Sequence, residues 1–320
     1  MRAKHLFVAS ELGVFESLAS GPKPLDELAR ASGCDATNAR IIVDAVTALS
    51  TQSPRRGFFE REGDRCRNGP VAQALLSGQG PVDMRPFIRF WSRLSYRRWL
   101  TLEDSVRLDR GTSGEFNFTA DEQKIFSEGV EAFSAGHAAA LAEAYDFSGH
   151  RRILDLGGST GLFLRAILER HAGVEGTLYE LPQAAAIARQ KLKGTACERG
   201  ITILEEDFLE DPPRGARRFS CRQCTARPGS GANQQLFRRV RAAAPRGARL
   251  LLLDVWTNAA HTEPLFAALM AGEFLVVGGN GDVCSIEEVR SWLDQTGWRF
   301  VGHKLLGEPA SLVIAEATGE

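Results

Sequence analysis

The sequence lacks any apolar run long enough to cross a membrane, because a spanning helix needs about 18 to 20 such residues in succession. Its richest apolar stretch, residues 265–277, is interrupted by Glu273, and the apolar segment before Glu11 is too short for a secretory signal. An excess of charge is also missing, since the formal net charge of −1 provides no attraction to nucleic acid or to an anionic membrane. We therefore expect neither a membrane nor a nucleic acid as a partner.

Cysteine is sparse as well. The 320 residues include 6 scattered Cys, which argues against a disulfide framework and favours a reducing, cytoplasmic location. Cys221 and Cys224 form a C-x-x-C pair, but zinc needs about four ligands and neither a second pair nor a nearby histidine supplies the others. We therefore expect no metal site. The length and the hydrophobic content of 43% suffice for a large core and two domains.

Residues 151–161 are the most informative part of the sequence. They predict a short buried strand, a tight glycine turn and the start of a helix. Asp155 lies inside the apolar strand, and a buried carboxylate is costly unless a cationic ligand or the backbone amides of the turn compensate it. The pattern therefore indicates a ligand site, with a purely structural glycine turn as the alternative.

Two further acidic residues follow predicted strands. Glu180 ends the next strand, about 20 residues beyond the turn, where a carboxylate can accept hydrogen bonds from ribose hydroxyls. Asp207 follows a third strand and is next to the aromatic Phe208. Because ligands of open α/β sheets bind beyond the carboxyl ends of the strands, we expect Asp155, Glu180 and Asp207 to converge on one crevice. The alternative for each carboxylate alone is a solvated strand end.

With these motifs in this order, nearly the whole chain resembles small-molecule O-methyltransferases that use S-adenosylmethionine (SAM), of the dimeric kind found in plant phenolic and bacterial polyketide pathways. Residues 154–161 stand where that family has its SAM glycine motif, and residues 179–182 stand where it has the Asp-Leu-Pro whose carboxylate holds the ribose. Residues 207 and 208 stand where it has an Asp followed by apolar residues against the adenine. The resemblance implies SAM as the cofactor, held by Asp155, Gly157, Gly158, Gly161, Glu180, Leu181, Asp207 and Phe208.

A dehydrogenase that uses a nicotinamide cofactor is disfavoured. The turn reads Gly-Gly-x-x-Gly, whereas dinucleotide-binding turns read Gly-x-Gly-x-x-Gly. Residues 148–320 alternate strand and helix, which predicts a parallel, Rossmann-like sheet and an α/β fold. The resemblance implies that these residues form the SAM-binding methyltransferase domain. Within it, a capping box at Ser285 predicts a helix that runs to about Trp298.

Residues 1–80 have a helical, winged-helix-like pattern, with a charged β wing over residues 55–68. Such a pattern raises the alternative of DNA binding. The helix predicted over residues 37–49 is apolar nearly all round, however, and its single Arg is too little to hold phosphates. The resemblance implies that this domain forms a homodimer, whose partner subunit would bury the second apolar face.

Residues 81–147 form a predicted helical connector rich in aromatic residues. Such side chains are usually part of a core, but an apolar pocket for a flat aromatic substrate also needs them. The resemblance implies that the connector closes over the substrate. We select Trp91, Phe126 and Phe133 as candidate contacts of a small aromatic substrate.

The expected catalytic base is missing. The sheet needs a fourth strand near residues 219–226, and the resemblance implies a general-base His near residues 225–228, where none occurs. Asp254, at the end of the following strand, is the only catalytic candidate that remains, while His261 is either recruited as a base or simply exposed on a loop. Residues 214–231 are rich in Arg, Pro, Gly and Cys, which suggests translation out of frame. The intact mass of the protein tests this hypothesis.

We therefore predict a SAM-dependent O-methyltransferase that methylates a phenolic hydroxyl of an aromatic secondary metabolite of polyketide type. The missing His leaves two alternatives open. One is a SAM-binding relative that supports hydroxylation or decarboxylation without methylating. The other is a catalytically silent dimer.

Overall fold

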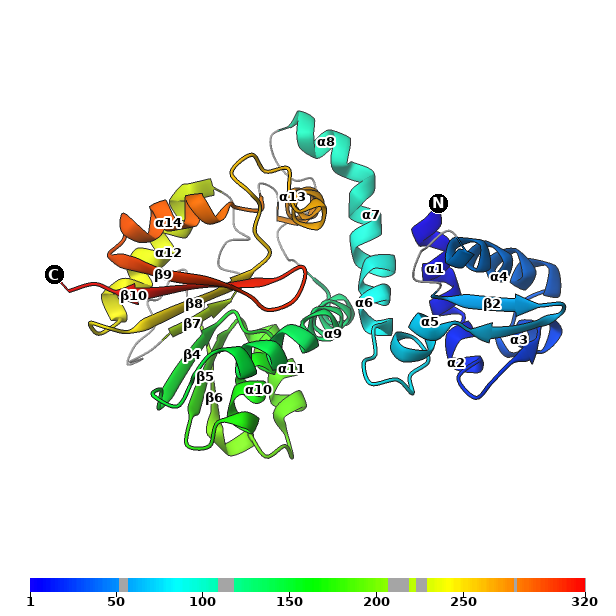
Figure 1. Cartoon of the computed structure of the whole chain (residues 1–320), viewed down its shortest axis with the longest axis horizontal. Coiled ribbons are helices and arrows are strands. Elements are labelled where there is room, and N and C mark those ends of the chain that lie inside the picture. Colours follow the sequence, from blue (N-terminus) through cyan, green and yellow to red (C-terminus); the bar gives the residue numbers. More distant parts are fainter. Residues whose placement is uncertain (52–56, 109–117, 207–218, 223–228, 279–280, 320) are drawn as a thin grey trace. The chain divides into compact units, whose positions relative to one another are not determined.

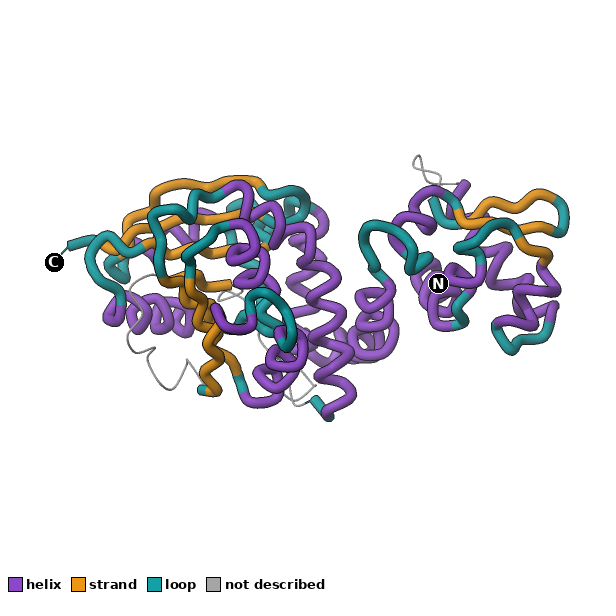
Figure 2. Tube along the Cα trace, turned by 90° about the horizontal axis from the view of Figure 1, so that it is seen from below, coloured by secondary structure: helices purple, strands orange, loops and turns teal. Residues whose placement is uncertain are grey.

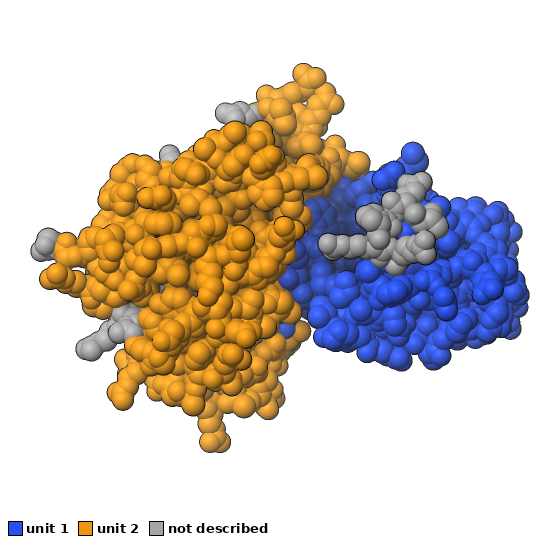
Figure 3. Space-filling view, in the orientation of Figure 1, with its two compact units in different colours: residues 1–97, 128–133 blue, residues 98–127, 134–320 orange. Residues whose placement is uncertain are grey.

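The computed structural model describes residues 1–51, 57–108, 118–206, 219–222, 229–278 and 281–319 (Figure 1). The chain divides into two compact units (Figure 3). The first unit contains residues 1–97 and 128–133, and the second contains residues 98–127 and 134–320. No helix among the described residues is long and apolar enough to span a bilayer.

The first unit contains short helices around a small antiparallel sheet with the strand order β1-β3-β2. Its elements up to residue 75 are α1 (Arg2–Glu11), α2 (Val14–Ser17), β1 (Lys23–Pro24), α3 (Leu25–Ala31), α4 (Ala36–Thr51), β2 (Phe59–Glu62), β3 (Arg65–Asn68) and α5 (Pro70–Leu75). Strands β2 and β3 pair as the expected wing, and Gly63 turns between them with a φ of 62°. The rings of Phe15 and Phe59 stack in the core, with their centroids 4.7 Å apart.

An irregular helical run leads from the first unit into the second. It consists of α6 (Arg85–Phe90), a π-helical turn η1 (Trp91–Ser95), α7 (Tyr96–Arg98), a 3₁₀ turn η2 (Trp99–Thr101) and α8 (Leu102–Arg107). The long helix α9 (Ala120–Ala144) follows, and a capping box of Thr119 and Glu122 begins it. The boundary between the two units, at residues 97 and 98, falls inside the irregular run.

The second unit contains a seven-stranded sheet with the order β6-β5-β4-β7-β8-β10-β9. Figure 2 shows its strands in orange among the surrounding helices. Its strands are β4 (Arg152–Leu156), β5 (Glu175–Glu180), β6 (Ile201–Glu205), β7 (Phe219–Arg222), β8 (Arg249–Asp254), β9 (Trp298–Leu305) and β10 (Ser311–Ala317). The first five are parallel, and β9 and β10 complete the sheet as an antiparallel hairpin. The expected α/β fold is confirmed.

Helices cover both faces of this sheet, which explains its apolar central strand. They are α10 (Leu162–Arg170), α11 (Pro182–Leu192), the 3₁₀ turn η3 (Glu198–Gly200), α12 (Gly229–Ala243), α13 (Leu265–Gly278) and α14 (Ile286–Asp294). Along β8, Leu251 and Leu253 belong to one core cluster with α10, α11 and α13. Leu250 and Leu252 belong to the cluster with α12 and α14 on the opposite face (Figure 1). A strand buried on both faces needs such a continuous apolar run.

Helix α14 begins where the capping box predicts and ends earlier than expected. Ser285 accepts a hydrogen bond from the amide of Glu288, and Glu288 accepts one from the amide of Ser285. The prediction that the helix reaches Trp298 is wrong: it ends at Asp294, because Gly297 adopts a left-handed φ of 80° and the edge strand β9 begins at Trp298. The buried indole of Trp298 donates to the Phe237 carbonyl on α12 at 3.0 Å.

We expect Ser285→Ala to lower the free energy of unfolding by about 1 kcal/mol, because it removes the side-chain oxygen that caps α14. Denaturant titration measures this loss. The control is Glu287→Gln, which alters an exposed residue of the same helical turn and leaves the cap intact. Equal losses in the two variants would contradict the capping role.

Candidate functional site

The turn after β4 has the tight conformation that its glycines predict. Gly157 and Gly161 adopt left-handed φ angles of 67° and 74°, and Ser159 between them also has a positive φ of 53°. The amide of Gly157 donates to the carbonyl of Tyr179 on β5 at 2.9 Å. Gly161 then begins α10, so the turn leads directly into a helix N-terminus.

Asp155 lies directly against this turn. Its side chain is 1% exposed, near the carboxyl end of β4. A Cβ atom added to Gly158 would lie 2.2 Å from Asp155 Oδ2 and 2.7 Å from Leu178 Cδ1. Only glycine fits there, because the backbone at position 158 lies so close to the carboxylate that no space remains for a Cβ atom.

Glu180 joins the same cluster from the end of β5. Its Oε2 accepts a hydrogen bond from the amide of Ser159 at 2.8 Å, and its Oε1 accepts one from the amide of Leu181 at 2.9 Å. A carboxylate has about four acceptor positions, two of which these amides use. The structure therefore brings Asp155, the glycine turn and Glu180 together at the carboxyl ends of two neighbouring strands. Leu181 precedes α11 and is 44% exposed.

The third expected cofactor contact, Asp207 with Phe208, lies outside the described residues. The strand before it, β6, ends at Glu205 beside Glu180 on β5. Glu206, the last described residue of this segment, accepts a hydrogen bond from the hydroxyl of the buried Tyr179.

Asp254 lies on the same edge of the sheet as the glycine turn. It is the last residue of β8, it is 8% exposed, and its Oδ1 accepts a hydrogen bond from the amide of Val255 at 2.8 Å. Strand β7 runs parallel to β4 on one side and to β8 on the other. The fourth strand is thus found where it was expected. Residues 225–228, where the resemblance implies a base, lie outside the described residues.

His261 is fixed by its surroundings. Its Nδ1 lies 3.2 Å from the carbonyl oxygen of Val283, and its Nε2 lies 3.3 Å from Oε2 of Glu288. Its backbone has a left-handed φ of 57°, in the loop between β8 and α13. Since both ring nitrogens have neighbours, His261 clamps this loop to the start of α14, and the structure gives no support to its recruitment as a base.

The same region holds a buried thiol. Burial is the main cause that raises the pKa of Cys284 to about 12, and the negative charges of Glu288, Asp254 and Asp282 add smaller contributions. We expect Cys284 to resist iodoacetamide at pH 8 in the native protein, because only the thiolate reacts rapidly. Peptide mass spectrometry measures the labelling, with the half-buried Cys34 as the internal comparison and unfolded protein as the control. Native labelling of Cys284 as fast as that of Cys34 would contradict this expectation.

The three candidate substrate contacts fall in both units. In the first unit, the ring of Phe87 lies 4.9 Å from that of Phe133 and 6.1 Å from that of Trp91, centroid to centroid. In the second, Phe126 packs against Phe118 at 5.1 Å. Trp91, Phe126 and Phe133 are all half-buried. The structure thus joins Trp91 and Phe133 through Phe87 and gives Phe126 a separate partner.

Glu273 is a buried carboxylate that the sequence analysis did not select. It is 3% exposed on α13, and its Oε2 accepts a hydrogen bond from the indole Nε1 of Trp99 at 2.6 Å. The signal was an acidic residue inside an otherwise apolar run. Among the described residues, no group of three or more His, Cys, Asp or Glu side chains could hold a metal ion.

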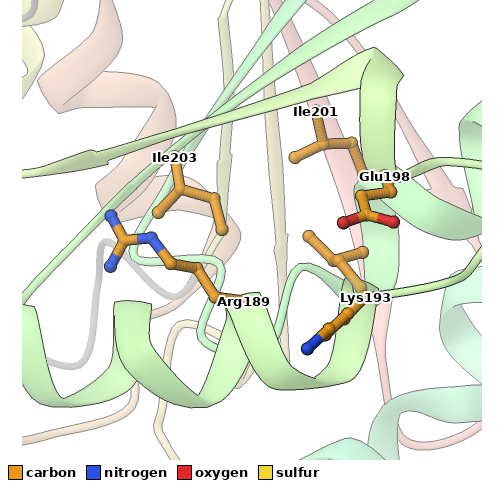
Figure 4. Close-up of a pocket in the computed structure, with 6 residues that line it drawn as sticks. Arg189, Lys193, Glu198, Ile201 and Ile203 are labelled. Carbon is orange, nitrogen blue, oxygen red and sulfur yellow. The ribbon is translucent and has the colours of Figure 1, made fainter.

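One cavity, of about 330 Å³, lies beside α11 and β6 (Figure 4). Its lining residues are Arg189, Leu192, Lys193, Glu198, Ile201 and Ile203. None of these is a candidate site residue, and the Arg189 guanidinium pairs with Glu205. We assign no ligand to this cavity.

Comparisons with known proteins give the family. A sequence model of the O-methyltransferase domain matches residues 109–299, and a model of the O-methyltransferase dimerisation domain matches residues 1–78. The chain belongs to the O-methyltransferase family. It is a SAM-dependent O-methyltransferase, so the expected enzyme class and cofactor are confirmed. The dimerisation domain supports a homodimer.

Relatives of this O-methyltransferase occur in bacteria and animals. It is 28% identical to 3-hydroxy-5-methyl-1-naphthoate 3-O-methyltransferase of Streptomyces sahachiroi, over 92% of this chain and 86% of that protein. It is 30% identical to acetylserotonin O-methyltransferase of Mus musculus, over 79% of this chain and 70% of that protein. Human N-acetylserotonin methyltransferase, solved in complex with SAM, has the same fold, with a TM-score of 0.88 at 22% identity over 99% and 94% of the two chains.

Proposed function

We propose that this O-methyltransferase methylates a phenolic hydroxyl of an aromatic secondary metabolite of polyketide type. The observation that carries the cofactor half of this proposal is the hydrogen bond from the amide of Ser159 to Glu180, beside the buried Asp155. The acceptor half draws support from the relative that acts on a hydroxynaphthoate. Family membership and such relatives favour methyl transfer over a relative that does not methylate and over a silent dimer.

The residues of the glycine turn fit SAM. The close approach of the backbone at Gly158 to Asp155 forms a cradle that any Cβ atom would fill. We propose that Asp155 and the turn hold the cationic part of SAM, that Glu180 accepts hydrogen bonds from the ribose, and that Leu181, Asp207 and Phe208 contact the adenosine. When bound, SAM supplies an electrophilic methyl group on a positively charged sulfur.

The protein's own task is then to orient the acceptor and to remove its proton. Alignment of the acceptor oxygen behind the methyl group can contribute about 7–11 kcal/mol. We propose Asp254 as the group that receives the proton, because it is a buried carboxylate on the same sheet edge. An acidic polyketide phenol needs this help less than a simple phenol, whose pKa is near 10. We further propose that Trp91, Phe126 and Phe133 contact the aromatic acceptor.

The domain roles follow from the same proposal. Residues 1–80 would form the dimerisation domain, residues 81–147 would form the connector that covers the acceptor, and residues 148–320 would bind SAM and perform the transfer. Ile41 on α4 is 48% exposed in the single chain, which suits burial against a second subunit.

The test combines binding with turnover. Calorimetry with SAM should detect binding, and incubation with methyl-labelled SAM should label hydroxynaphthoates and leave their O-methylated counterparts unlabelled. We expect Asp254→Asn to lower kcat by about 10²–10⁴-fold, the usual contribution of a general base, without changing the Kd for SAM. Binding of SAM without transfer to any phenolic acceptor would reject the proposal.

Asp282→Asn is the matched control for Asp254→Asn. Each of the two carboxylates accepts a hydrogen bond from the amide of the residue that follows it, at 2.7 Å for Asp282 and 2.8 Å for Asp254. Asp282, unlike Asp254, is exposed. Equal losses of kcat in both variants would mean that Asp254 acts only through local structure.

A further inference from the structure

Glu273 differs from the other buried acidic residues of the described part of the chain. Asp155, Glu180 and Asp254 lie at or near the carboxyl ends of parallel strands, whereas Glu273 lies within the apolar helix α13. A carboxylate buried among apolar side chains lowers stability unless it is hydrogen-bonded. Glu273 therefore needs a hydrogen-bond donor.

That contact comes from far along the chain. The indole Nε1 of Trp99 donates to Glu273 Oε2 at 2.6 Å, across a sequence separation of 174 residues. The neighbouring Gly272 makes room for the ring, because a Cβ atom at that position would lie 2.8 Å from Trp99 Cη2. The hydrogen bond to Glu273 thus holds the Trp99 ring against α13, and the absence of a side chain at Gly272 lets the ring come close.

Arg98 completes this contact. Its guanidinium lies 4.7 Å from the centroid of the Phe118 ring. Burial lowers the pKa of Arg98, and the charges of Glu273 and Glu122 oppose that effect. The side chains of two successive residues, Arg98 and Trp99, are therefore each held within the second unit.

The rest of residues 98–108 is lightly packed. Ser105 is the one buried residue of this segment, while Leu100, Val106 and Leu108 are 81%, 64% and 54% exposed. A segment with few buried apolar contacts opens locally at a low free-energy cost. Trp99, together with Arg98, therefore provides much of its attachment to the rest of the second unit.

Helix α13 is itself fixed beside the sheet edge that carries Asp254. It follows the loop that leaves the carboxyl end of β8, and it contacts α8 (Figure 1). Ala267 of α13 belongs to one core cluster with Leu253 and Val255, which flank Asp254. The Trp99 side chain, which is hydrogen-bonded to α13, is thus anchored to the same core that holds Asp254.

We propose that Glu273 is a positioning residue for the acceptor: through Trp99 it holds residues 98–108 in the place where they cover the acceptor beside Asp254. This inference rests on the proposed function, because it assumes an acceptor at that edge. It assigns Glu273 no role in binding SAM and no direct part in proton transfer.

The test uses three variants of the full-length protein. Trp99→Phe removes the donor and keeps an aromatic ring, and Glu273→Leu removes the acceptor with a residue that suits the apolar helix. Glu273→Gln keeps a side-chain oxygen that can accept from Trp99. The matched control is Glu287→Gln at an exposed position of α14. For each variant we would measure the hydrogen exchange of the peptide spanning residues 98–108. The same variants give the Kd for SAM and the KM and kcat for a hydroxynaphthoate.

We expect Trp99→Phe and Glu273→Leu to accelerate exchange in residues 98–108 by about tenfold and to raise the KM for the acceptor by at least fivefold. The Kd for SAM should stay within twofold, and Glu273→Gln should behave much more like the wild type. Unchanged exchange overturns the proposal, and so does faster exchange with an unchanged KM. A loss of kcat in Glu273→Gln with normal exchange also overturns it, because Glu273 would then act directly on the reaction.

The two proposals fail in different ways. A wild-type protein that binds no SAM or labels no phenol rejects the proposed function, and the inference about the acceptor is rejected with it. A wild-type protein that methylates normally, together with variants that change neither exchange nor KM, rejects only the positioning role of Glu273.

Discussion

Gly158→Ala is expected to weaken SAM binding by about 10- to 100-fold. The added methyl group would lie 2.2 Å from Asp155 Oδ2, 2.6 Å from its Cγ and 2.7 Å from Leu178 Cδ1. Overpacking of a tight site costs about 1–3 kcal/mol and occasionally more, and tenfold in affinity corresponds to about 1.4 kcal/mol. Either the carboxylate or the turn must move, and both belong to the proposed cofactor site. Titration calorimetry with SAM measures the effect.

The control for this substitution is Gly136→Ala. Gly136 lies in α9, and a Cβ atom there would meet nothing within 4 Å. Alanine is favoured over glycine inside a helix, so stability should rise slightly and SAM binding should stay the same. If Gly158→Ala bound SAM as tightly as Gly136→Ala, the turn would not be the cofactor site.

Glu180→Gln is expected to weaken SAM binding by about 10- to 100-fold. The carboxylate accepts hydrogen bonds from the amides of Ser159 and Leu181, and a glutamine has only one oxygen to offer them. A hydrogen bond to a charged group contributes about 1.5–3 kcal/mol, and the proposed ribose contact also depends on the charge. Calorimetry with SAM tests the binding, and hydrogen exchange at Ser159 tests the turn.

Glu175→Gln is the matched control, because Glu175 begins the same strand that Glu180 ends. Its side chain is 70% exposed and lies 3.5 Å from the guanidinium of Arg152, an arrangement typical of a weak surface ion pair. Its Kd for SAM should match that of the wild type. Similar losses in both variants would show that charge on β5, rather than the position of Glu180, determines the affinity.

The parts of the site that were predictable from the sequence are those set by local rules. Successive parallel strands bring their carboxyl ends to one edge, so the meeting of Asp155 and Glu180 followed from the strand pattern. The capping box at Ser285 was equally local, since its partner is three residues away. The helix that it begins was predicted too long, because the left-handed turn at Gly297 stops it.

The features of the structure that could not be predicted depend on contacts between residues far apart in the sequence. The bond between Trp99 and Glu273 joins residues 174 positions apart, and no periodicity predicts it. The clamp on His261 likewise requires Val283 and Glu288 from beyond α13. The fourth strand was expected near residues 219–226, but it too depends on distant partners, because residues 219–222 pair with β4 on one side and β8 on the other.

The hydrogen bond between Ser159 and Glu180 has a consequence for affinity. It ties the glycine turn to the neighbouring strand β5, as does the bond from the Gly157 amide to the Tyr179 carbonyl. Contacts within the protein therefore restrict the conformations that the backbone of the turn can adopt. At the proposed cofactor site, such preorganisation would strengthen binding without any additional contact to the ligand.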